Sequence, residues 1–196
     1  MLIPLHIFTP RPAATDANCE VTCEVTCNLS SLNIRYSLNI SLAEAQAKLA
    51  WPDPLAHAGR TSGLWEHTCF EVFLRQPGSA AYIEVNAAPT GAWNCFGFSD
   101  YRQDMHETRE PRVTTVLAGS NPQAPAQLQL VLDLQDWCKA TGPAARSAQS
   151  KLQLGLSAVI EDKQGVLGYF ALGHANGKPD FHHHLNHSLT IPWSHP

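Results

Sequence analysis

Two neighbouring stretches, 63–74 and 81–87, alternate apolar side chains with side chains that can hold a ligand. The second kind comprises Trp65, His67, Cys69, Glu71 and Phe73 in the first stretch, and Tyr82, Glu84 and Asn86 in the second. Alternation with a period of two is typical of strands, whose successive side chains point to opposite faces. A purely structural strand would carry Thr, Lys, Ser or Gln outward. The two stretches therefore predict a binding wall on adjacent strands.

Such a wall suits a sugar, because an apolar ring face stacks on Trp or Tyr while planar polar side chains hold the hydroxyls. We expect the site to comprise Arg60, Trp65, His67, Glu71, Tyr82, Glu84, Asn86, Trp93 and Arg102. The structural alternative is that the tryptophans pack between loops or in the core. In that case the glutamates would pair with the arginines in an internal network.

Catalysis is a second alternative for the two glutamates. If Glu71 and Glu84 lay opposite each other on adjacent strands, they would be about 5 Å apart, the separation that a retaining glycosidase uses. Serine-nucleophile motifs of the GxSxG type are absent from the sequence. Cys69 and His67, two residues apart on one strand face, suit packing better than a catalytic dyad. We therefore expect a protein that is not an enzyme.

A histidine cluster follows near the C-terminus, in the segment 181–187. On a strand, His182 and His184 would share one face and could chelate a metal together with His174. A solvated or internally bonded cluster is the favoured interpretation, because no HExxH or HxE…CxxC pattern accompanies these histidines. We expect no metal site here.

Composition limits the function further. The 196 residues suit a single domain spanning 1–196, and the net charge of −4 argues against a nucleic-acid or anionic-membrane surface. Apolar runs stay well short of the roughly 20 residues that span a bilayer. The first eight residues lack a basic region of the kind that opens a secretory signal, so we expect a cytoplasmic protein.

Three cysteines support a reducing compartment. Cys19, Cys23 and Cys27 are spaced by four in a strand-like segment, which places successive sulfurs about 13 Å apart on one face. A disulfide needs Cα atoms within about 7 Å, so these three cannot bridge one another on that strand. We interpret them as buried thiols that serve as small apolar residues.

Short strands separated by turn residues predict the fold. The expected strands are 2–8, 19–29, 31–40, 63–74, 81–87, 93–98, 112–117, 126–134, 151–161, 166–174 and one or two within 181–193. A capping box at Ser41–Glu44 opens one short helix to about residue 50, and 136–150 reads as irregular. About nine to eleven strands with one helix indicate an all-β, antiparallel β-sandwich, of jelly-roll or immunoglobulin-like type.

These motifs resemble the bacterial DOMON-like domains, a group related to the family 9 carbohydrate-binding modules. The likeness lies in Arg60, in 63–74, 82–86, 89–93, Tyr101-Arg102, 156–161 and 178–182, and is most specific from Leu64 to Leu74. The resemblance implies a β-sandwich whose sheet face or rim binds a sugar or, in other DOMON branches, haem.

The haem alternative depends on residue types. Haem-binding relatives hold the iron with a Met and a His, or with a Met and a Lys. Met105, His174 and Lys178 are the candidates of those types. A Met/His pair would give a low-spin, electron-transferring haem b. Our expectation is a non-catalytic module that binds a glycan or a sugar-like small molecule without a cofactor, with a cytochrome-like protein as the alternative.

Overall fold

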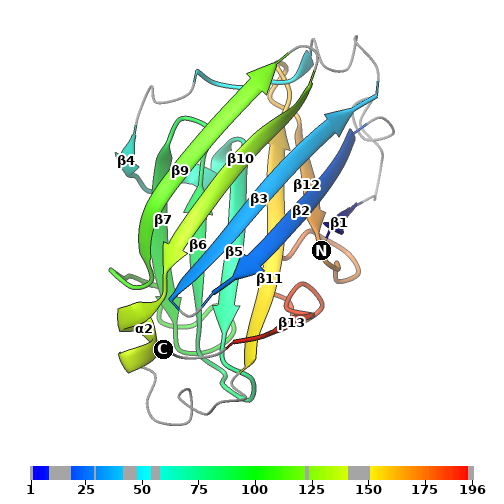
Figure 1. The fold of residues 1–196 in the computed structure, drawn as a ribbon. Coiled ribbons are helices and arrows are strands. Elements are labelled where there is room, and N and C mark those ends of the chain that lie inside the picture. Colours follow the sequence, from blue (N-terminus) through cyan, green and yellow to red (C-terminus); the bar gives the residue numbers. More distant parts are fainter. Residues whose placement is uncertain are drawn as a thin grey trace.

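The computed structural model describes residues 2–8, 19–28, 30–41, 48–53, 58–121, 124–140 and 151–193 (Figure 1). In this part of the chain, 13 strands form one continuous sheet. They are accompanied by a 3₁₀ helix, η2 (Leu64–Glu66), and a short α-helix, α2 (Gln135–Ala140). The strands are β1 (Leu2–Ile7), β2 (Cys19–Cys27), β3 (Ser31–Ile40), β4 (Gly59–Arg60), β5 (Cys69–Arg75), β6 (Tyr82–Ala87), β7 (Ala92–Phe98), β8 (His106–Glu107), β9 (Arg112–Asn121), β10 (Ala124–Asp133), β11 (Lys151–Glu161), β12 (Leu167–Ala171) and β13 (Leu189–Pro192).

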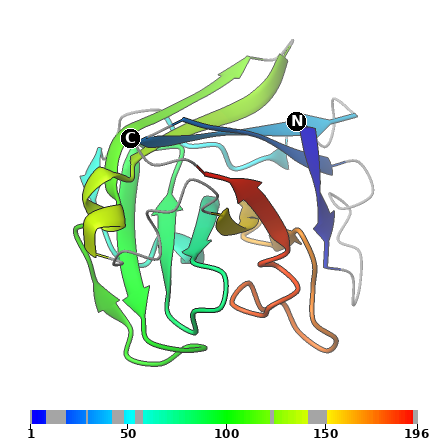
Figure 2. The ribbon, with the colours of Figure 1, turned by 60° about the horizontal axis from the view of Figure 1, so that its bottom comes forward.

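Strand β1 joins two layers of this sheet. The hydrogen-bonded order is β4-β7-β6-β5-β11-β12-β1-β2-β3-β10-β9, with β13 beside β11 and β8 beside β7. The first part of β1 pairs with β2, and its last two residues pair with β12. We call β2, β3, β10 and β9 the front layer, and β12, β11, β5, β6, β7 and β4 the back layer. With the bottom of the molecule turned forward, β1 is seen along the side that connects the two layers (Figure 2).

Alternating apolar residues of both layers form the core between them. In β3 the alternate side chains from Leu32 to Leu38 are buried, and in β10 those from Leu128 to Leu132 are buried. The ring of Tyr36 lies 4.9 Å from that of Phe70 in the opposite layer, and its hydroxyl donates to the backbone carbonyl of Glu71 at 2.7 Å. The period of two predicted for these strands therefore buries one face of each.

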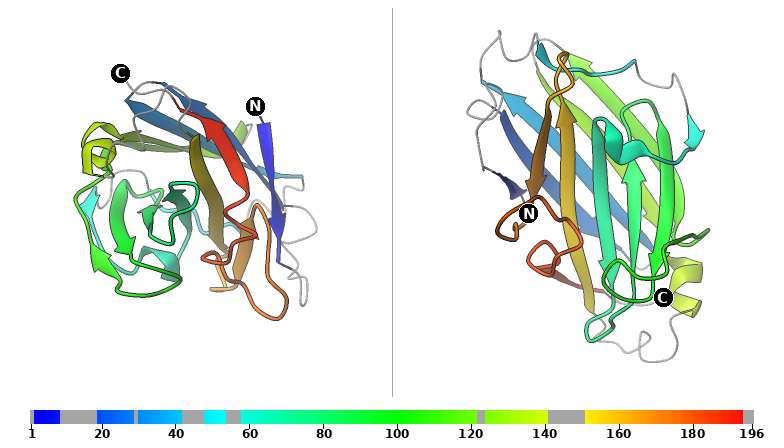
Figure 3. Two further views of the ribbon diagram at one scale, coloured as in Figure 1. Left: turned by 90° about the horizontal axis from the view of Figure 1, so that it is seen from below. Right: turned by 180° about the vertical axis from the view of Figure 1, so that it is seen from behind.

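The back layer is also buried on much of its outer face. A second apolar cluster lies there, made of Cys69, Phe73, Tyr82, Phe96, Phe98, Val159, Ala171 and Phe181. The segment 172–188 runs beside β11 and β12 on this side of the molecule (Figure 3). As a result, every residue of β5 from Cys69 to Leu74 is buried. Polar residues on this face are thus enclosed and must find partners inside the protein.

Most of the predicted strands are confirmed. Strands β3 and β11 have the predicted bounds, and β1, β2, β6 and β12 lie within the predicted ranges. The turn that precedes β12 contains Gly165 with φ 78°, the left-handed conformation expected there. Cys19, Cys23 and Cys27 are free thiols on one face of β2, and Cys23 is fully buried. The fold is therefore a nearly all-β, two-layer sandwich.

Some details differ from the prediction. The sheet is mixed, because β4 pairs with β7 in parallel. Strand β5 begins at Cys69 and not at residue 63, because Gly63 takes φ 75° and starts helix η2. Strands β9 and β10 extend into the connection between residues 117 and 126 that separated the two predicted strands.

The ends of the chain show further differences. Residues 181–187 form turns, and the last strand is confined to Leu189–Pro192. Helix α2 lies partly in the segment that was predicted to be irregular. The predicted helix from Ser41 to about residue 50 falls mostly on 42–47, outside the described residues.

Candidate functional site

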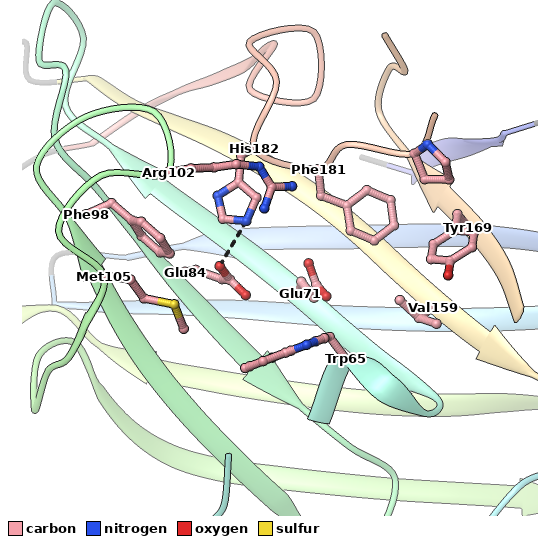
Figure 4. Close-up of a pocket in the computed structure, with 11 residues that line it drawn as sticks. Trp65, Glu71, Glu84, Phe98, Arg102, Met105, Val159, Tyr169, Phe181 and His182 are labelled. Carbon is pink, nitrogen blue, oxygen red and sulfur yellow. Dashed lines mark ion pairs between the residues drawn. The ribbon is translucent and has the colours of Figure 1, made fainter. Parts of the chain in front are cut away.

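A cavity of about 380 Å³ opens on the outer face of the back layer. It has aromatic walls around an acidic floor (Figure 4). Its lining residues are Trp65, Glu71, Glu84, Phe98, Arg102, Met105, Val159, Tyr169, Pro179, Phe181 and His182. These side chains come from η2, from β5, β6, β7, β11 and β12, and from the segments 99–105 and 172–188. The curled sheet therefore brings together residues that are more than a hundred positions apart in the sequence.

Two glutamates form the floor of this cavity. On the paired strands β5 and β6, Glu71 lies opposite Asn86 and Glu84 lies opposite Phe73, so the two carboxylates are diagonal neighbours. Glu71 is 3% exposed and Glu84 is 5% exposed. Glu71 accepts a hydrogen bond from the Ser157 hydroxyl at 3.3 Å, and Glu84 accepts one from the Asn86 amide at 2.7 Å.

Burial controls the protonation of both floor carboxyls. It raises the pKa of Glu71 well above its ordinary value, and the charge of Glu84 raises it further. Burial also raises the pKa of Glu84 to about 7, although the Asn86 hydrogen bond and the charge of Arg102 act in the opposite direction. Two close carboxylates in a poorly hydrated site disfavour double ionisation. Below neutral pH the floor of the free protein therefore carries protonated carboxyl groups.

A hydrogen-bond chain supports the floor from one side. The backbone N–H of Arg102 donates to the Tyr82 hydroxyl at 3.1 Å, and that hydroxyl lies 2.7 Å from Nδ1 of His182. Nε2 of His182 lies 3.5 Å from a carboxylate oxygen of Glu84. This carboxylate favours a proton on Nε2, so Tyr82 donates to Nδ1. Burial lowers the pKa of His182 to about 4, and the ring is neutral at physiological pH.

Arg102 lies at the mouth of the cavity in a constrained backbone conformation. Its φ of 55° is in the left-handed region, which residues other than glycine adopt rarely. Its guanidinium donates to Asp180 at 2.9 Å, and the Tyr101 hydroxyl donates to the same carboxylate. Burial acts to raise the pKa of Asp180, but the hydrogen bonds from Tyr101 and Arg102 outweigh it and lower that pKa. The charge of Arg102 is therefore matched by an ionised aspartate.

The walls are apolar and partly open to solvent. Trp65 is 37% exposed, and its ring packs edge-on against Phe96 with the centroids 5.7 Å apart. Met105, 50% exposed, lies beside the same opening, and Phe181 lies on the far side of the glutamates (Figure 4). A flat ligand could stack on the exposed face of Trp65 while its polar groups reach Glu71 below.

His67, which the sequence assigned to the wall, points elsewhere. It follows η2 and precedes β5, and its Nδ1 lies 2.8 Å from a carboxylate oxygen of Glu161. Both residues line a separate cleft of about 520 Å³ together with Leu64, Trp51 and other residues. The assignment assumed that the strand began at residue 63. Because β5 starts at Cys69, the period of two does not extend to His67.

Arg60 and Trp93 are also separated from the cavity. Trp93 is paired with Ala87 in the sheet, and its ring packs against the core between the layers. The guanidinium of Arg60 lies over this ring, 4.7 Å from its centroid, and donates to Asn94 at 2.9 Å. Trp93 is one position from Asn94, which shares the outer face with Glu84, so the tryptophan faces inward.

The remaining predicted residues gather at one place. Trp65, Glu71, Glu84 and Arg102 line the cavity, while Tyr82 and Asn86 hydrogen-bond to the lining residues His182 and Glu84. The sequence reasoning missed the lining residues Phe98, Val159, Tyr169, Pro179 and Phe181, and the supporting residue Asp180. The 178–182 motif was the available signal for Phe181 and Asp180, but only the histidines of that segment were weighed as ligands.

The candidates for metal or haem ligation fit poorly. Met105 and His182 line the same cavity, but both ring nitrogens of His182 are directed at Tyr82 and Glu84. His174 lies outside the lining, with its Nε2 against the backbone carbonyl of His6, and His184 is exposed. Within the described ranges, no group of three or more His, Cys, Asp or Glu residues is placed to hold a metal ion. This donor set offers a haem iron no free imidazole nitrogen in the cavity.

Comparisons with known proteins bear on the fold. No protein-family model and no curated protein matches the chain. A solved structure from Bacteroides uniformis, of a protein for which carbohydrate binding has been inferred, superposes with a TM-score of 0.67 at 14% identity, covering 99% of this chain and 86% of that one.

Two further solved structures are of a family 9 carbohydrate-binding module from Caldicellulosiruptor kristjanssonii. The complex with cellotriose gives a TM-score of 0.54 at 7% identity, covering 99% of this chain and 84% of that one. The complex with glucose gives 0.53 at 10% identity, covering 98% and 85%. At these identities the likeness shows that the chain has the sandwich fold of such modules. Among the residues that the structure describes, no helix has the length and apolar character of a membrane span.

Proposed function

We propose that this protein is a non-catalytic module that binds a carbohydrate in the cavity on the outer face of the back layer. The observation that carries the proposal is the juxtaposition of the exposed Trp65 ring with the buried carboxyls of Glu71 and Glu84. A sugar needs both parts, because its apolar ring face stacks on an aromatic surface and its hydroxyls need fixed polar partners. The solved neighbours that hold cellotriose and glucose support the same choice of ligand.

In this proposal the floor is a fixed set of hydrogen-bonding groups. A protonated Glu71 or Glu84 donates to a sugar hydroxyl, and an ionised one accepts from it. Arg102 contributes a donor at the rim, where Asp180 and Tyr82 hold it in place. Because these groups are preorganised by bonds within the protein, little conformational entropy is lost when the sugar binds.

The proposed module binds its sugar without hydrolysing it. The glycosidase alternative required Glu71 and Glu84 to lie directly opposite each other. In the structure they are offset along their strands. Each also has a partner within the protein: Ser157 for Glu71, and Asn86 and His182 for Glu84. Such groups suit the binding of a ligand better than the shuttling of protons.

Several expectations from the sequence remain parts of the same proposal. These are the kinship with bacterial DOMON-like domains, a single domain over 1–196, a cytoplasmic location, and function without a cofactor or a nucleic-acid partner. The resemblance of the 63–74 block supports the kinship, and the net charge of −4 supports the lack of a nucleic-acid partner.

Isothermal titration calorimetry with glucose and cellotriose tests the proposal. We expect binding by the wild type, and at least about tenfold weaker binding by Trp65→Ala, since a stacked aromatic ring contributes on the order of 1 kcal/mol beyond the area it buries. Leu117→Ala, an exposed apolar residue of β9 on the other layer, is the matched control and should bind like the wild type. Equal affinities for the wild type and Trp65→Ala would refute the site.

A further inference from the structure

The charges around the cavity are unbalanced. The ionisable groups that line or border it are Glu71, Glu84, Arg102, His182, Asp180, Tyr82, Tyr101 and Tyr169. Arg102 is the only one of these eight that carries a permanent positive charge. Ionised floor glutamates would therefore add two negative charges to a site in which a single cation is present.

That single cation already has a partner. The guanidinium of Arg102 lies 2.9 Å from Asp180, whose side chain is almost completely buried. His182 adds no charge, because its burial keeps the ring neutral at physiological pH. The pair formed by Arg102 and Asp180 is neutral overall, so Glu71 and Glu84 have no cationic partner of their own. Burying carboxylates without such a partner is unfavourable, which is why their pKa values are raised.

The floor also has an unused acceptor that faces the cavity. One oxygen of Glu71 accepts from Ser157, and in the described part of the chain the other has no hydrogen-bond partner. Glu71 is only 3% exposed, and its carboxyl lies at the centre of the cavity between Trp65 and Phe181 (Figure 4). Opposite Glu71 on β6, the side-chain oxygen of the fully buried Asn86 has no hydrogen-bond partner among the described residues. Of these two oxygens, the one on Glu71 lines the cavity and is available to a ligand that donates hydrogen bonds.

The walls suit a positively charged ligand as well. The faces of aromatic rings attract cations through their quadrupoles, and Trp is the most effective of them. Trp65, Phe98, Tyr169 and Phe181 surround the two glutamates, and the polarisable thioether of Met105 closes the rim. A ring face for stacking and an ammonium group for the floor are found together in an amino sugar.

We infer that the ligand of this site is an amino sugar, whose protonated amine is bound by Glu71 and Glu84 while its ring stacks on Trp65. The inference rests on the proposed carbohydrate-binding function and specifies the class of sugar. The ammonium donates three hydrogen bonds and supplies the positive charge that the floor lacks. A sugar acid would place a third acidic group beside the first two without supplying a positive charge, so its binding is disfavoured.

Calorimetry at pH 6.5 with four monosaccharides tests this inference: glucosamine, N-acetylglucosamine, glucose and glucuronate. N-acetylglucosamine is the matched ligand, because it retains the nitrogen but loses its charge. We expect glucosamine to bind at least about tenfold tighter than N-acetylglucosamine and glucose, as is usual for a charge-assisted hydrogen bond, and glucuronate to bind most weakly. Equal affinities for glucosamine and N-acetylglucosamine would overturn the inference.

Two variants locate the effect on the floor. Glu71→Gln and Glu84→Gln preserve shape and retain an oxygen for Ser157 or Asn86, and circular dichroism confirms whether each is folded. Either should reduce the preference for glucosamine over N-acetylglucosamine to within about twofold. If both variants keep the full preference, the ammonium is bound elsewhere and the inference fails.

Proton release gives a readout that needs no variant. A bound ammonium lowers the pKa values of the floor carboxyls, so the protein should release protons when glucosamine binds. This release is measured as a dependence of the binding heat on the ionisation enthalpy of the buffer. Glucose should release none. Glucose binding that depends on Trp65, without a preference for glucosamine, would refute the inference and leave the proposed function intact. If none of the sugars binds, both the inference and the proposed function are refuted. If cyclohexylamine binds as tightly as glucosamine, the site recognises amines and not sugars.

Discussion

Replacing Glu84 by Gln should stabilise the protein at alkaline pH. Glu84 is 5% exposed on the floor of the cavity, and burial raises its pKa from the ordinary value of 4.5 to about 7. Because folding raises this pKa, the carboxyl favours the folded state below pH 4.5. That contribution is lost as the pH rises from about 4.5 through about 7, where the buried group must ionise.

The size of the effect follows from the shift. One pKa unit corresponds to about 1.4 kcal/mol, so the wild type should lose about 3 kcal/mol of unfolding free energy through this residue between pH 4.5 and pH 8. Glutamine has the shape of the protonated carboxyl and does not ionise. Glu84→Gln should therefore resemble the wild type near pH 5 and be more stable by up to about 3 kcal/mol at pH 8.

Urea denaturation at pH 5 and pH 8, followed by tryptophan fluorescence, measures this difference. Glu20→Gln is the matched control, because Glu20 is exposed on β2 in the front layer and its replacement should change stability equally little at both pH values. If the stability of Glu84→Gln relative to the wild type is the same at pH 5 and pH 8, then Glu84 titrates normally and the description of an unbalanced floor is refuted.

Three further predictions concern groups around the site. Tyr36→Phe removes the hydroxyl that donates at 2.7 Å to the backbone of β5, and should lower the unfolding free energy by about 1 kcal/mol in urea. Gly155→Ala should cost about 1–3 kcal/mol in the same assay, because a Cβ there would lie 2.8 Å from the buried ring of His187; a variant as stable as the wild type would contradict that packing. Asp180→Asn leaves the charge of Arg102 unmatched, and should reduce the calorimetric preference for glucosamine over N-acetylglucosamine at least about threefold; an unchanged preference would show that Arg102 has little influence on the floor.

The alternation of residue types predicted much of the sandwich. Strands such as β3 and β10 bury one face each, so a period of two is visible in their sequences, and the bounds of β3 follow from it. The same reasoning placed Glu71, Tyr82 and Glu84 on one face, and the structure finds them around one cavity. These residues share a face because they lie on paired strands.

The errors arose where the period of two stops. A single residue, Gly63, turns the chain into η2 before β5, and this directs His67 into another cleft while leaving Trp65 at the cavity. For Trp93, the sequence did not show which face of the strand points to the core. An exposed and an inward tryptophan look alike in a strand with apolar residues on both faces. Local sequence patterns do not reveal which phase faces the core.

The far wall could not be derived from local patterns at all. Phe181 and His182 reach the cavity from turns that follow β12, and Arg102 reaches it from a turn after β7. The contact between these segments depends on loops whose paths are set by tertiary bonds, such as the one from Arg102 to Asp180. The sequence identified Arg102 as a polar candidate, and the 178–182 motif contained Asp180, but no local pattern paired the two.

The most direct test of the account is a titration of ¹⁵N-labelled protein with glucosamine, followed by two-dimensional NMR. The account predicts that the indole N–H of Trp65 and the backbone amides of Met105, Phe181 and His182 shift together along one binding curve. It also predicts no shift for Trp51 or for the other residues of the separate cleft of about 520 Å³. Shifts confined to that second cleft, with the Trp65 signal unmoved, would contradict the central claim that the cavity over Glu71 and Glu84 is the binding site.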